Sequence, residues 1–355
     1  MYNFRERFRR NFPSPIFTRS LPKSRRANFA NAIAFCLSLC YNYRMKYKDI
    51  GGIRASRLCL GSMRIADKPI ENINRLVGVA LDMGINLFDH ADIYGGGSCE
   101  RMYGELIRKT PSLRRRMVLQ TKCGICAGRY DSSYKHIVGS VDASLSRLCT
   151  DYIDILLLHR PDALMRPEEI ARAFDELEKS GKVRVFGVSN FSAQHIDLLQ
   201  STVNQTLFVD QLQLSPTYCP LIDQGINVNT PAACDVAGGA LEYCRKNGIT
   251  IQTYGTMQCS FTDETGYFYS GAFTTEHANK KYFALNFMLG GLAQKYGVTP
   301  EAVAVAWVLH HPADMQAIIG TTLDKRLALY KDCCEVPLTD AEWYDIYKAA
   351  GHSLP

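Results

Sequence analysis

An alternation of short apolar runs and helical segments, repeated eight times from residue 57 onward, most constrains the fold. Each run is nearly continuous in apolar residues, which is typical of strands in a parallel sheet covered by helices. Between the runs, apolar residues recur at helical spacing over about a dozen positions. The predicted strands are Arg57–Leu60, Asn86–Asp89, Met117–Lys122, Ile153–His159, Val183–Ser189, Leu207–Gln211, Thr250–Tyr254 and Gln316–Ile319. The alternation therefore predicts an α/β fold with a parallel sheet.

The segments between these runs carry the end signals of helices. Pro167 occupies a first helical position, and Gly84, Gly181 and Gly248 lie just past helix ends. The predicted helices are Ile70–Met83, Cys99–Arg108, Tyr134–Leu148, Pro167–Ser180, Ala193–Gln200, Gly239–Lys246, Lys280–Tyr296, Pro300–His310, Lys325–Tyr330 and Thr339–Ala349. We expect the last of them to pack on the outside of the sheet.

Eight strand-helix units close naturally into a (β/α)₈ barrel, the TIM barrel. The alternative is an open doubly wound sheet, which normally carries G-x-G-x-x-G after its first strand. That turn here reads Leu60-Gly61-Ser62-Met63-Arg64 and lacks this pattern. We therefore predict a barrel over residues 45–355. Two long stretches, Ser215–Val236 and Gly255–Asn279, follow strands six and seven, where barrels place substrate loops.

The beginning of the chain differs from the rest in charge. Residues 1–45 hold nine Lys or Arg and one Glu, so the remaining chain has a net charge of −2 within a total of +6. The basic balance therefore gives no reason to expect nucleic-acid binding by the folded part. The apolar patch Ala30–Cys40 is shorter than the roughly 20 residues that cross a bilayer. Residues 1–44 fit a signal-like or transit-like segment, a disordered basic arm or translated sequence upstream of the native start; we favour the last, because the patterned domain begins at Met45.

Thirteen cysteines are scattered along the chain, and their number is odd. This indicates free thiols in a reducing compartment, so we expect a cytoplasmic protein. The segment Cys123-Gly-Ile-Cys126 has the spacing of a redox motif or of half a zinc site. No second cysteine pair or histidine pair completes a tetrahedral set, and we expect no metal.

Polar residues close three of the predicted strands. Asp89 ends the second, Lys122 the third and His159 the fourth, and Tyr94 follows Asp89 beside three glycines. The carboxyl ends of barrel strands meet at one rim, so these four side chains should share a pocket. Each alone has an ordinary structural explanation. Burying Asp and Lys side by side costs several kcal/mol, however, which favours a functional reading of the set.

These four side chains can together perform a narrow chemistry. A tyrosine is a poor acid near neutral pH, because its ordinary pKa is about 10, but a neighbouring ammonium lowers that pKa. Asp89 would hold Lys122 charged and aimed, and His159 would orient a carbonyl oxygen and donate a hydrogen bond to it. Such a site protonates an alkoxide and needs a hydride from a cofactor.

The chain resembles the aldo-keto reductase family over about residues 46–335. Asp89, Tyr94, Lys122 and His159 match the catalytic tetrad of the family at all four positions. The resemblance implies NADP(H) as cofactor. It implies nicotinamide contacts at Ser189 and Asn190 in the segment Gly187–Phe191, at Gln211 and at Tyr254, and contacts to the adenosine phosphates at Gly320, Thr321, Thr322 and Arg326. The cofactor-binding set also includes Gly61 and Met63, and the substrate-lining set is Arg64, Ile93, Ile125 and Arg160.

Two departures from the family pattern affect specificity. Many members carry Lys where Gly320 stands, so preference for NADPH over NADH depends here on Arg326 alone. The segment from residue 335 is short compared with members whose C-terminal loop shapes the substrate pocket.

The expected function is reduction of a small aldehyde or ketone by a monomer or small homo-oligomer, without nucleic-acid or membrane partners. The alternative is a nucleotide-sensing regulatory subunit that resembles the potassium-channel β-subunit branch and turns over little. A lyase or isomerase would need a phosphate or metal site, which the sequence does not offer.

Overall fold

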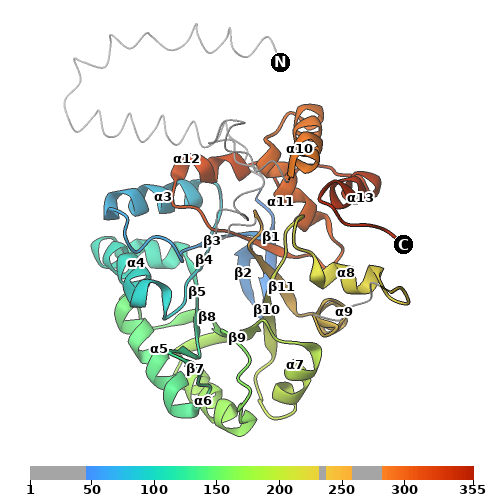
Figure 1. Cartoon of the computed structure of the whole chain (residues 1–355). Helices are drawn as coiled ribbons and strands as arrows, with labels where there is room; N and C mark the ends of the chain where they lie inside the picture. Colours follow the sequence, from blue (N-terminus) through green and yellow to red (C-terminus); the bar gives the residue numbers. More distant parts are fainter. Residues whose placement is uncertain (1–44, 232–236, 258–281) are drawn as a thin grey trace, which may run out of the picture. The chain divides into compact units, whose positions relative to one another are not determined.

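A computed structural model describes residues 45–231, 237–257 and 282–355. Eight parallel strands form a closed barrel in the order β10-β11-β12-β3-β4-β5-β8-β9, with helices around it (Figure 1). The barrel strands are β3 Leu58–Gly61, β4 Leu87–Asp89, β5 Val118–Cys123, β8 Ile153–Leu158, β9 Val183–Ser189, β10 Leu207–Gln213, β11 Thr250–Tyr254 and β12 Gln316–Ile319. The predicted (β/α)₈ barrel is confirmed, and each predicted strand ends within two residues of its predicted position.

The helices also follow the predicted segments closely. In α6, the buried residues Ile170, Ala173, Phe174 and Leu177 recur at helical spacing, so one face packs inward. The helices are α3 Ile70–Asp82, α4 Ser98–Lys109, α5 Tyr134–Leu148, α6 Pro167–Lys179, α7 Ala193–Gln200, α8 Pro220–Ile226, α9 Ala240–Asn247, α10 Phe283–Tyr296, α11 Pro300–His310, α12 Asp324–Leu327 and α13 Asp340–Ala349, with short 3₁₀ segments at Tyr94–Gly97, Pro111–Arg116 and Ala328–Tyr330.

A few elements differ from the sequence-based expectation. The hairpin of β1 Tyr47–Ile50 and β2 Ile53–Ser56 was not predicted, nor was that of β6 Ile125–Cys126 and β7 Arg129–Tyr130. Helix α8 was also missed. Strands β1 and β2 carry charged residues among their four positions, and β6 and β7 hold two residues each, so none of them forms the apolar run by which the barrel strands were predicted. The segment Lys325–Tyr330, predicted as one helix, is α12 followed by a 3₁₀ turn.

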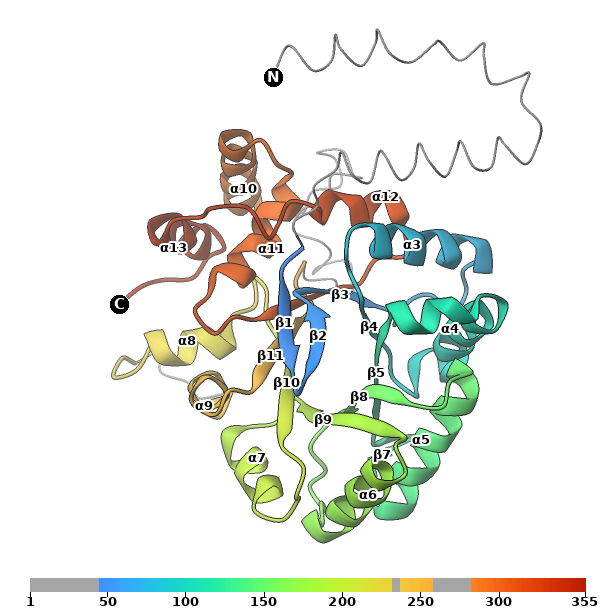
Figure 2. The same cartoon turned by 180° about the vertical axis from the view of Figure 1, so that it is seen from behind.

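The β1–β2 hairpin closes the amino-terminal end of the barrel (Figure 2). Ile50, Ile53 and Ala55 from the hairpin pack in one buried cluster with barrel side chains such as Leu87 and Val118, the first residues of β4 and β5. Ile155, Leu157, Val185, Val209, Cys59 and Ile318 complete this cluster. We call the five residues Ile50, Ile53, Ala55, Leu87 and Val118 the barrel floor. The interior at this end is therefore packed and apolar.

The C-terminal helix packs on the outside of the barrel, as predicted. Trp343 of α13 stacks on Trp307 of α11, with ring centroids 4.8 Å apart. Each indole N–H donates to the backbone oxygen of the other tryptophan, at 3.0 Å in both directions. The stacked rings are buried with both N–H groups satisfied, which anchors the end of the chain.

Several expectations fall partly outside the described residues. These are the N-terminal extension 1–44, residues 232–236 of one predicted substrate loop and residues 258–279 of the other, together with 280 and 281 at the start of a predicted helix. Along the parts of the chain that the structure covers, no helix combines the length and apolar character needed to cross a bilayer. The nine cysteines in those parts are all free thiols.

Candidate active site

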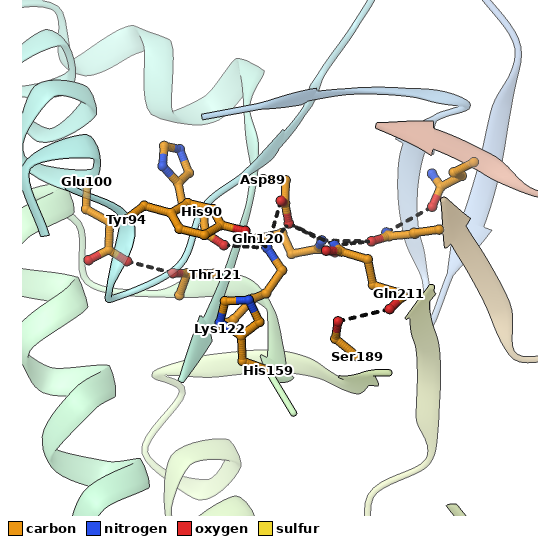
Figure 3. Close-up of polar contacts among 12 residues, drawn as sticks. Asp89, His90, Tyr94, Glu100, Gln120, Thr121, Lys122, His159, Ser189 and Gln211 are labelled. Carbon is orange, nitrogen blue, oxygen red and sulfur yellow. Dashed lines mark hydrogen bonds and ion pairs between the residues drawn. The ribbon is translucent and has the colours of Figure 1, made fainter. Parts of the chain in front are cut away.

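Three adjacent strands bring the predicted tetrad together. Asp89 is the last residue of β4 and Lys122 lies one residue before the end of β5. His159 directly follows β8, which pairs with β5, and β5 in turn pairs with β4. Tyr94 opens the 3₁₀ turn after β4. The side chains of all four converge on one region (Figure 3).

A buried ion pair forms the centre of this group. The Lys122 ammonium lies 2.7 Å from each carboxylate oxygen of Asp89 and 2.7 Å from the backbone oxygen of His90. The Lys122 side chain is fully buried and that of Asp89 is 4% exposed. Burial alone would lower the pKa of Lys122, but the Asp89 carboxylate beside it raises that pKa above its usual value. Lys122 is therefore a fixed cation.

Tyr94 approaches this cation through its hydroxyl group. Lys122 Nζ lies 3.3 Å from Tyr94 Oη. Burial raises the pKa of Tyr94 above its usual value, and the Lys122 ammonium opposes that rise. The ammonium lowers the pKa of Tyr94 as expected, but burial outweighs it. The net pKa of Tyr94 therefore lies above the ordinary tyrosine value, and the prediction of a net lowering is wrong. The cation reduces the cost of forming a phenolate that burial would otherwise make prohibitive.

His159 also lies beside the phenol (Figure 3). Its ring is 5.8 Å from that of Tyr94, nearly perpendicular to it. Burial, reinforced by the Lys122 charge, lowers the pKa of His159 to about 3. A neutral imidazole carries one N–H and one acceptor nitrogen. At ordinary pH, His159 can therefore donate a hydrogen bond without carrying a charge.

Glycines shape the turn that presents Tyr94. Gly95 and Gly96 have φ angles of +57° and +61°, which side chains with a Cβ rarely adopt. A Cβ on Gly95 would also lie 2.5 Å from the Cβ of Ala66. The Asp92 amide donates to the backbone oxygen of Lys122 at 3.0 Å, which ties the turn to β5. The glycines beside Tyr94 are thus a requirement of the turn that carries the phenol.

A cavity of about 470 Å³ opens above these side chains. Its lining includes Asp89, Tyr94 and His159, whereas Lys122 lies behind them, fully buried. All predicted cofactor and substrate residues line it as well: Gly61, Met63, Arg64, Ile93, Ile125, Arg160, Ser189, Asn190, Gln211, Tyr254, Gly320, Thr321, Thr322 and Arg326. Residues from opposite ends of the sequence therefore share one cavity.

One side of the cavity is a chain of hydrogen-bonded polar side chains. Tyr254 donates from its hydroxyl to Asn190 Oδ1 at 2.7 Å, and Asn190 Nδ2 donates to Ser189 Oγ at 2.8 Å. Ser189 in turn donates to the backbone oxygen of Gln211 at 2.9 Å. Asn190 has a left-handed φ of +63°, a conformation that Asn adopts more readily than most residues. These hydrogen bonds fix the side chains of this wall relative to one another.

Sequence reasoning missed several residues at this site. Gln120 donates from Nε2 to Asp89 Oδ1 at 2.7 Å, and Gln211 Nε2 donates to the same oxygen at 3.0 Å. Gln120 lies two residues before Lys122, so strand periodicity could have placed both side chains on one face of β5. Ser62, Gln213, Ile318 and Tyr330 also line the cavity and were not predicted, whereas Gly255, Thr256 and Met257 line it from the start of the predicted substrate loop.

Possible metal ligands gather elsewhere on the described part of the chain. One group is Cys126, Asp131 and His136, and the other is Cys219, Asp223 and His352. None of these six residues lines the cavity. The predicted redox spacing at Cys123 and Cys126 places one thiol buried in the barrel wall and the other half-buried beside His136.

Comparisons with known proteins agree with this geometry. The Aldo/keto reductase family model matches residues 57–350. The chain is 33% identical over 324 residues to Oxidoreductase YdhF of Escherichia coli (strain K12), an alignment that covers 86% of this chain and 97% of that protein. It is 32% identical over 311 residues to a 6-dehydroglucose reductase of Agrobacterium fabrum, with 84% and 95% covered.

Solved structures share the fold. The glycerol dehydrogenase of Gluconobacter oxydans aligns with a TM-score of 0.68 at 27% identity, covering 85% of this chain and 94% of that one. Both the family match and the similarity to curated oxidoreductases extend over most of the chain. The chain therefore belongs to the aldo/keto reductase family of oxidoreductases.

Proposed function

We propose that this protein is an NADPH-dependent reductase of aldehydes or ketones in which Tyr94 donates the proton. One observation carries the proposal: the Lys122 ammonium contacts both oxygens of Asp89 and lies 3.3 Å from the Tyr94 hydroxyl. This arrangement places a fixed positive charge where a phenolate would form. Electrostatic stabilisation of a developing charge by a preorganised group is commonly the largest contribution to catalysis.

The cavity offers suitable groups for a nicotinamide cofactor. The side-chain oxygen of Gln211 can accept from a carboxamide, Asn190 carries a side-chain amide, and Tyr254 offers an aromatic ring beside them. Thr321 and Arg326 supply a hydroxyl group and a guanidinium for phosphate oxygens. A bound nicotinamide would supply the hydride. We assign the 2′-phosphate to Arg326, which favours NADPH over NADH.

The remaining tetrad members prepare the proton transfer. Asp89 holds the Lys122 ammonium in place by accepting two hydrogen bonds from it. His159, neutral at ordinary pH, donates to the substrate carbonyl oxygen and aims it at the Tyr94 hydroxyl. Tyr94 then releases its proton to that oxygen, and Lys122 stabilises the phenolate left behind.

We assign the mouth of the cavity to a small-molecule carbonyl substrate. Ile93 and Ile125 offer apolar contacts, and Arg64 and Arg160 offer cationic groups. A sugar-derived carbonyl compound is a first candidate to assay, because a relative with 32% identity is named a 6-dehydroglucose reductase. Both the polar and the apolar side chains at the mouth suit a ligand of mixed character.

The experiment is to follow oxidation of NADPH, and separately of NADH, with 4-nitrobenzaldehyde as a generic substrate. Wild-type protein should turn over many times, and Tyr94→Phe should lower kcat by about 10²–10⁴-fold while still binding NADPH, since a positioned acid contributes about that much. Tyr344→Phe, on the exposed side of α13, is the matched control and should retain kcat. Undiminished turnover by Tyr94→Phe would refute the assignment. A wild-type protein that retains NADPH but shows negligible turnover would favour the nucleotide-sensing alternative.

A further inference from the structure

A row of buried glutamines crosses the barrel interior just below the tetrad. Gln120, Gln252 and Gln316 are fully buried and Gln211 is 3% exposed. They lie on β5, β11, β12 and β10, and strand register places Gln120 beside Asp89 and Gln252 beside both Gln211 and Gln316. Figure 3 shows Gln120 and Gln211, whose side-chain nitrogens both donate to Asp89. We call these four residues the glutamine relay.

Its two ends determine which way each amide faces. At one end, Gln316 Nε2 donates to the backbone oxygen of Ser56 at 2.8 Å, because a carbonyl only accepts. Gln316 Oε1 must then face Gln252, whose Nε2 donates to it at 3.0 Å. Gln252 Oε1 is left to accept from Gln120 Nε2 at 2.7 Å and from Gln211 Nε2 at 3.3 Å.

At the other end, the same two nitrogens meet the carboxylate of Asp89. Gln120 and Gln211 each give one amide hydrogen to Gln252 and the other to Asp89 Oδ1. Both ends of the relay are acceptors, so only one orientation of the four amides lets every amide nitrogen donate to an acceptor. Ser56 is the last residue of β2, and the relay therefore runs from the floor hairpin to the tetrad.

The relay leaves one buried group unpaired. Gln120 Oε1 has no hydrogen-bond partner in the part of the chain that the structure describes. Turning this amide over would point its oxygen at Asp89 and at Gln252 Oε1, which are both acceptors. An unpaired buried carbonyl is costly, and departures of this kind concentrate at functional sites. In this arrangement Gln120 donates a hydrogen bond to Asp89, and its own side-chain oxygen is left without a partner among the described residues.

We propose that Gln252 and Gln316 are positioning residues that hold the amide nitrogens of Gln120 and Gln211 against Asp89. Two directed N–H groups at Oδ1 keep the carboxylate in place and leave it aimed at Lys122. The relay also engages both amide hydrogens of Gln211, so a ligand in the cavity meets the oxygen of that side chain. The consequence for turnover rests on the proposed reductase function; the orientation of the amides does not.

The orientation is tested on the apoprotein by side-chain amide hydrogen exchange, with ¹⁵N-labelled glutamine and the Gln211 signal assigned from Gln211→Met. In wild type we expect slow exchange of the Gln211 amide hydrogens. Gln252→Met, which keeps the volume but removes the polar group, should speed that exchange about tenfold or more. Gln205→Met, at another buried glutamine that bonds Asp175 and Glu178 outside the site, is the control and should leave exchange unchanged. Equal exchange in wild type and Gln252→Met would overturn the proposal.

The effect on catalysis is tested with the same variants and with Gln252→Glu. Gln252→Met should lower kcat about tenfold, and Gln205→Met should not. In Gln252→Glu, the protonated carboxyl can both accept from Gln120 and donate to Gln316, whereas the ionised carboxylate faces the oxygen of Gln316. Burial raises the pKa of such a carboxyl to about 6–9, so Gln252→Glu should match wild type at low pH and lose activity as pH rises.

A pH–activity profile of Gln252→Glu that coincides with wild type, together with an undiminished kcat in Gln252→Met, would reduce the relay to a packing feature. Thermal midpoints of all variants establish that they are folded. If wild-type protein itself does not turn over, the reductase proposal fails, and the exchange measurement alone decides the orientation of the relay.

Discussion

The floor of the barrel and its upper rim are built from the same strands but from opposite kinds of side chain. On β5, the inward-facing residues are Val118, Gln120 and Lys122, two positions apart. Val118 belongs to the apolar floor, Gln120 to the relay and Lys122 to the tetrad. On β4, Leu87 and Asp89 repeat this step from apolar to charged.

This difference separates the side chains that stabilise the fold from those that form the candidate active site. Apolar side chains at the floor gain free energy from burial without needing partners. At the rim, each buried charge requires several hydrogen bonds, and replacing buried ion pairs by apolar residues is often neutral or stabilising in proteins. We therefore infer that the charged side chains at the rim serve the reaction, whereas the apolar side chains at the floor serve stability.

The largest effect is expected at Lys122, whose substitution should lower both the turnover rate and the stability of the fold. Lys122→Met removes the cation beside Tyr94 and leaves the buried Asp89 carboxylate without its counter-charge. We expect kcat to fall by about 10²-fold or more and the free energy of unfolding to fall by about 3–5 kcal/mol. Steady-state turnover and denaturant unfolding measure the two losses. A variant with normal kcat would show that the ammonium does not assist the phenol.

A floor substitution should affect stability alone. Leu87→Ala removes a fully buried side chain of the floor, two residues before Asp89 on the same face of β4. The free energy of unfolding should fall by about 2–5 kcal/mol, from lost burial and the cavity left behind. Below its unfolding temperature, kcat per folded molecule should be unchanged. A large loss of kcat in fully folded Leu87→Ala protein would show that packing at the floor also determines activity at the rim.

Substitution at the open mouth should have a small effect confined to specificity. Arg160 directly follows His159, lines the cavity and is exposed to solvent. Arg160→Met should raise KM for 4-carboxybenzaldehyde about two- to fivefold, the range of an exposed ion pair, with little change for neutral 4-nitrobenzaldehyde. An equal change in KM for both aldehydes would show that Arg160 does not recognise the charge of the substrate.

The smallest expected effect is an absent one. Because the pKa of His159 is about 3, its ring should stay neutral from pH 5 to 8. The pH profile of kcat should therefore show no change near pH 6.5 that can be assigned to His159 by comparison with His159→Gln. Stability should respond instead. The lowered folded-state pKa means that His159 favours folding above pH about 6.5 and that this contribution is lost as pH falls toward 3. Thermal midpoints of wild type and His159→Gln across this range measure it.

The sequence predicted the barrel and its rim better than its interior. Apolar runs and helix end signals located all eight barrel strands, and the polar residues at three strand ends, Asp89, Lys122 and His159, indicated side chains that the structure brings together. The β1–β2 hairpin escaped notice because its strands, Tyr47–Ile50 and Ile53–Ser56, carry charged residues and lack the continuous apolar run of the barrel strands. Gln252 and Gln316 escaped because a buried glutamine in a strand has no distinctive local pattern, and its partners lie on neighbouring strands far away in sequence.

The net pKa of Tyr94 also lay beyond the sequence. Its neighbour Lys122 could be predicted, but the depth of burial that outweighs this neighbour is a property of the folded structure. Thr321 and Arg326 were expected from the family resemblance to contact the phosphates of a cofactor, and they line the same cavity as Tyr94.

The central claim is that the charged pair at the rim is kept for proton transfer and not for stability, and one double variant tests it most directly. Asp89→Asn with Lys122→Met removes both charges while leaving an amide oxygen to accept from Gln120 and Gln211. We predict that turnover of 4-nitrobenzaldehyde falls by about 10²-fold or more, while the thermal midpoint stays within about 5 °C of wild type. A double variant that still turns over at the wild-type rate, or that unfolds as readily as Lys122→Met alone, would contradict it.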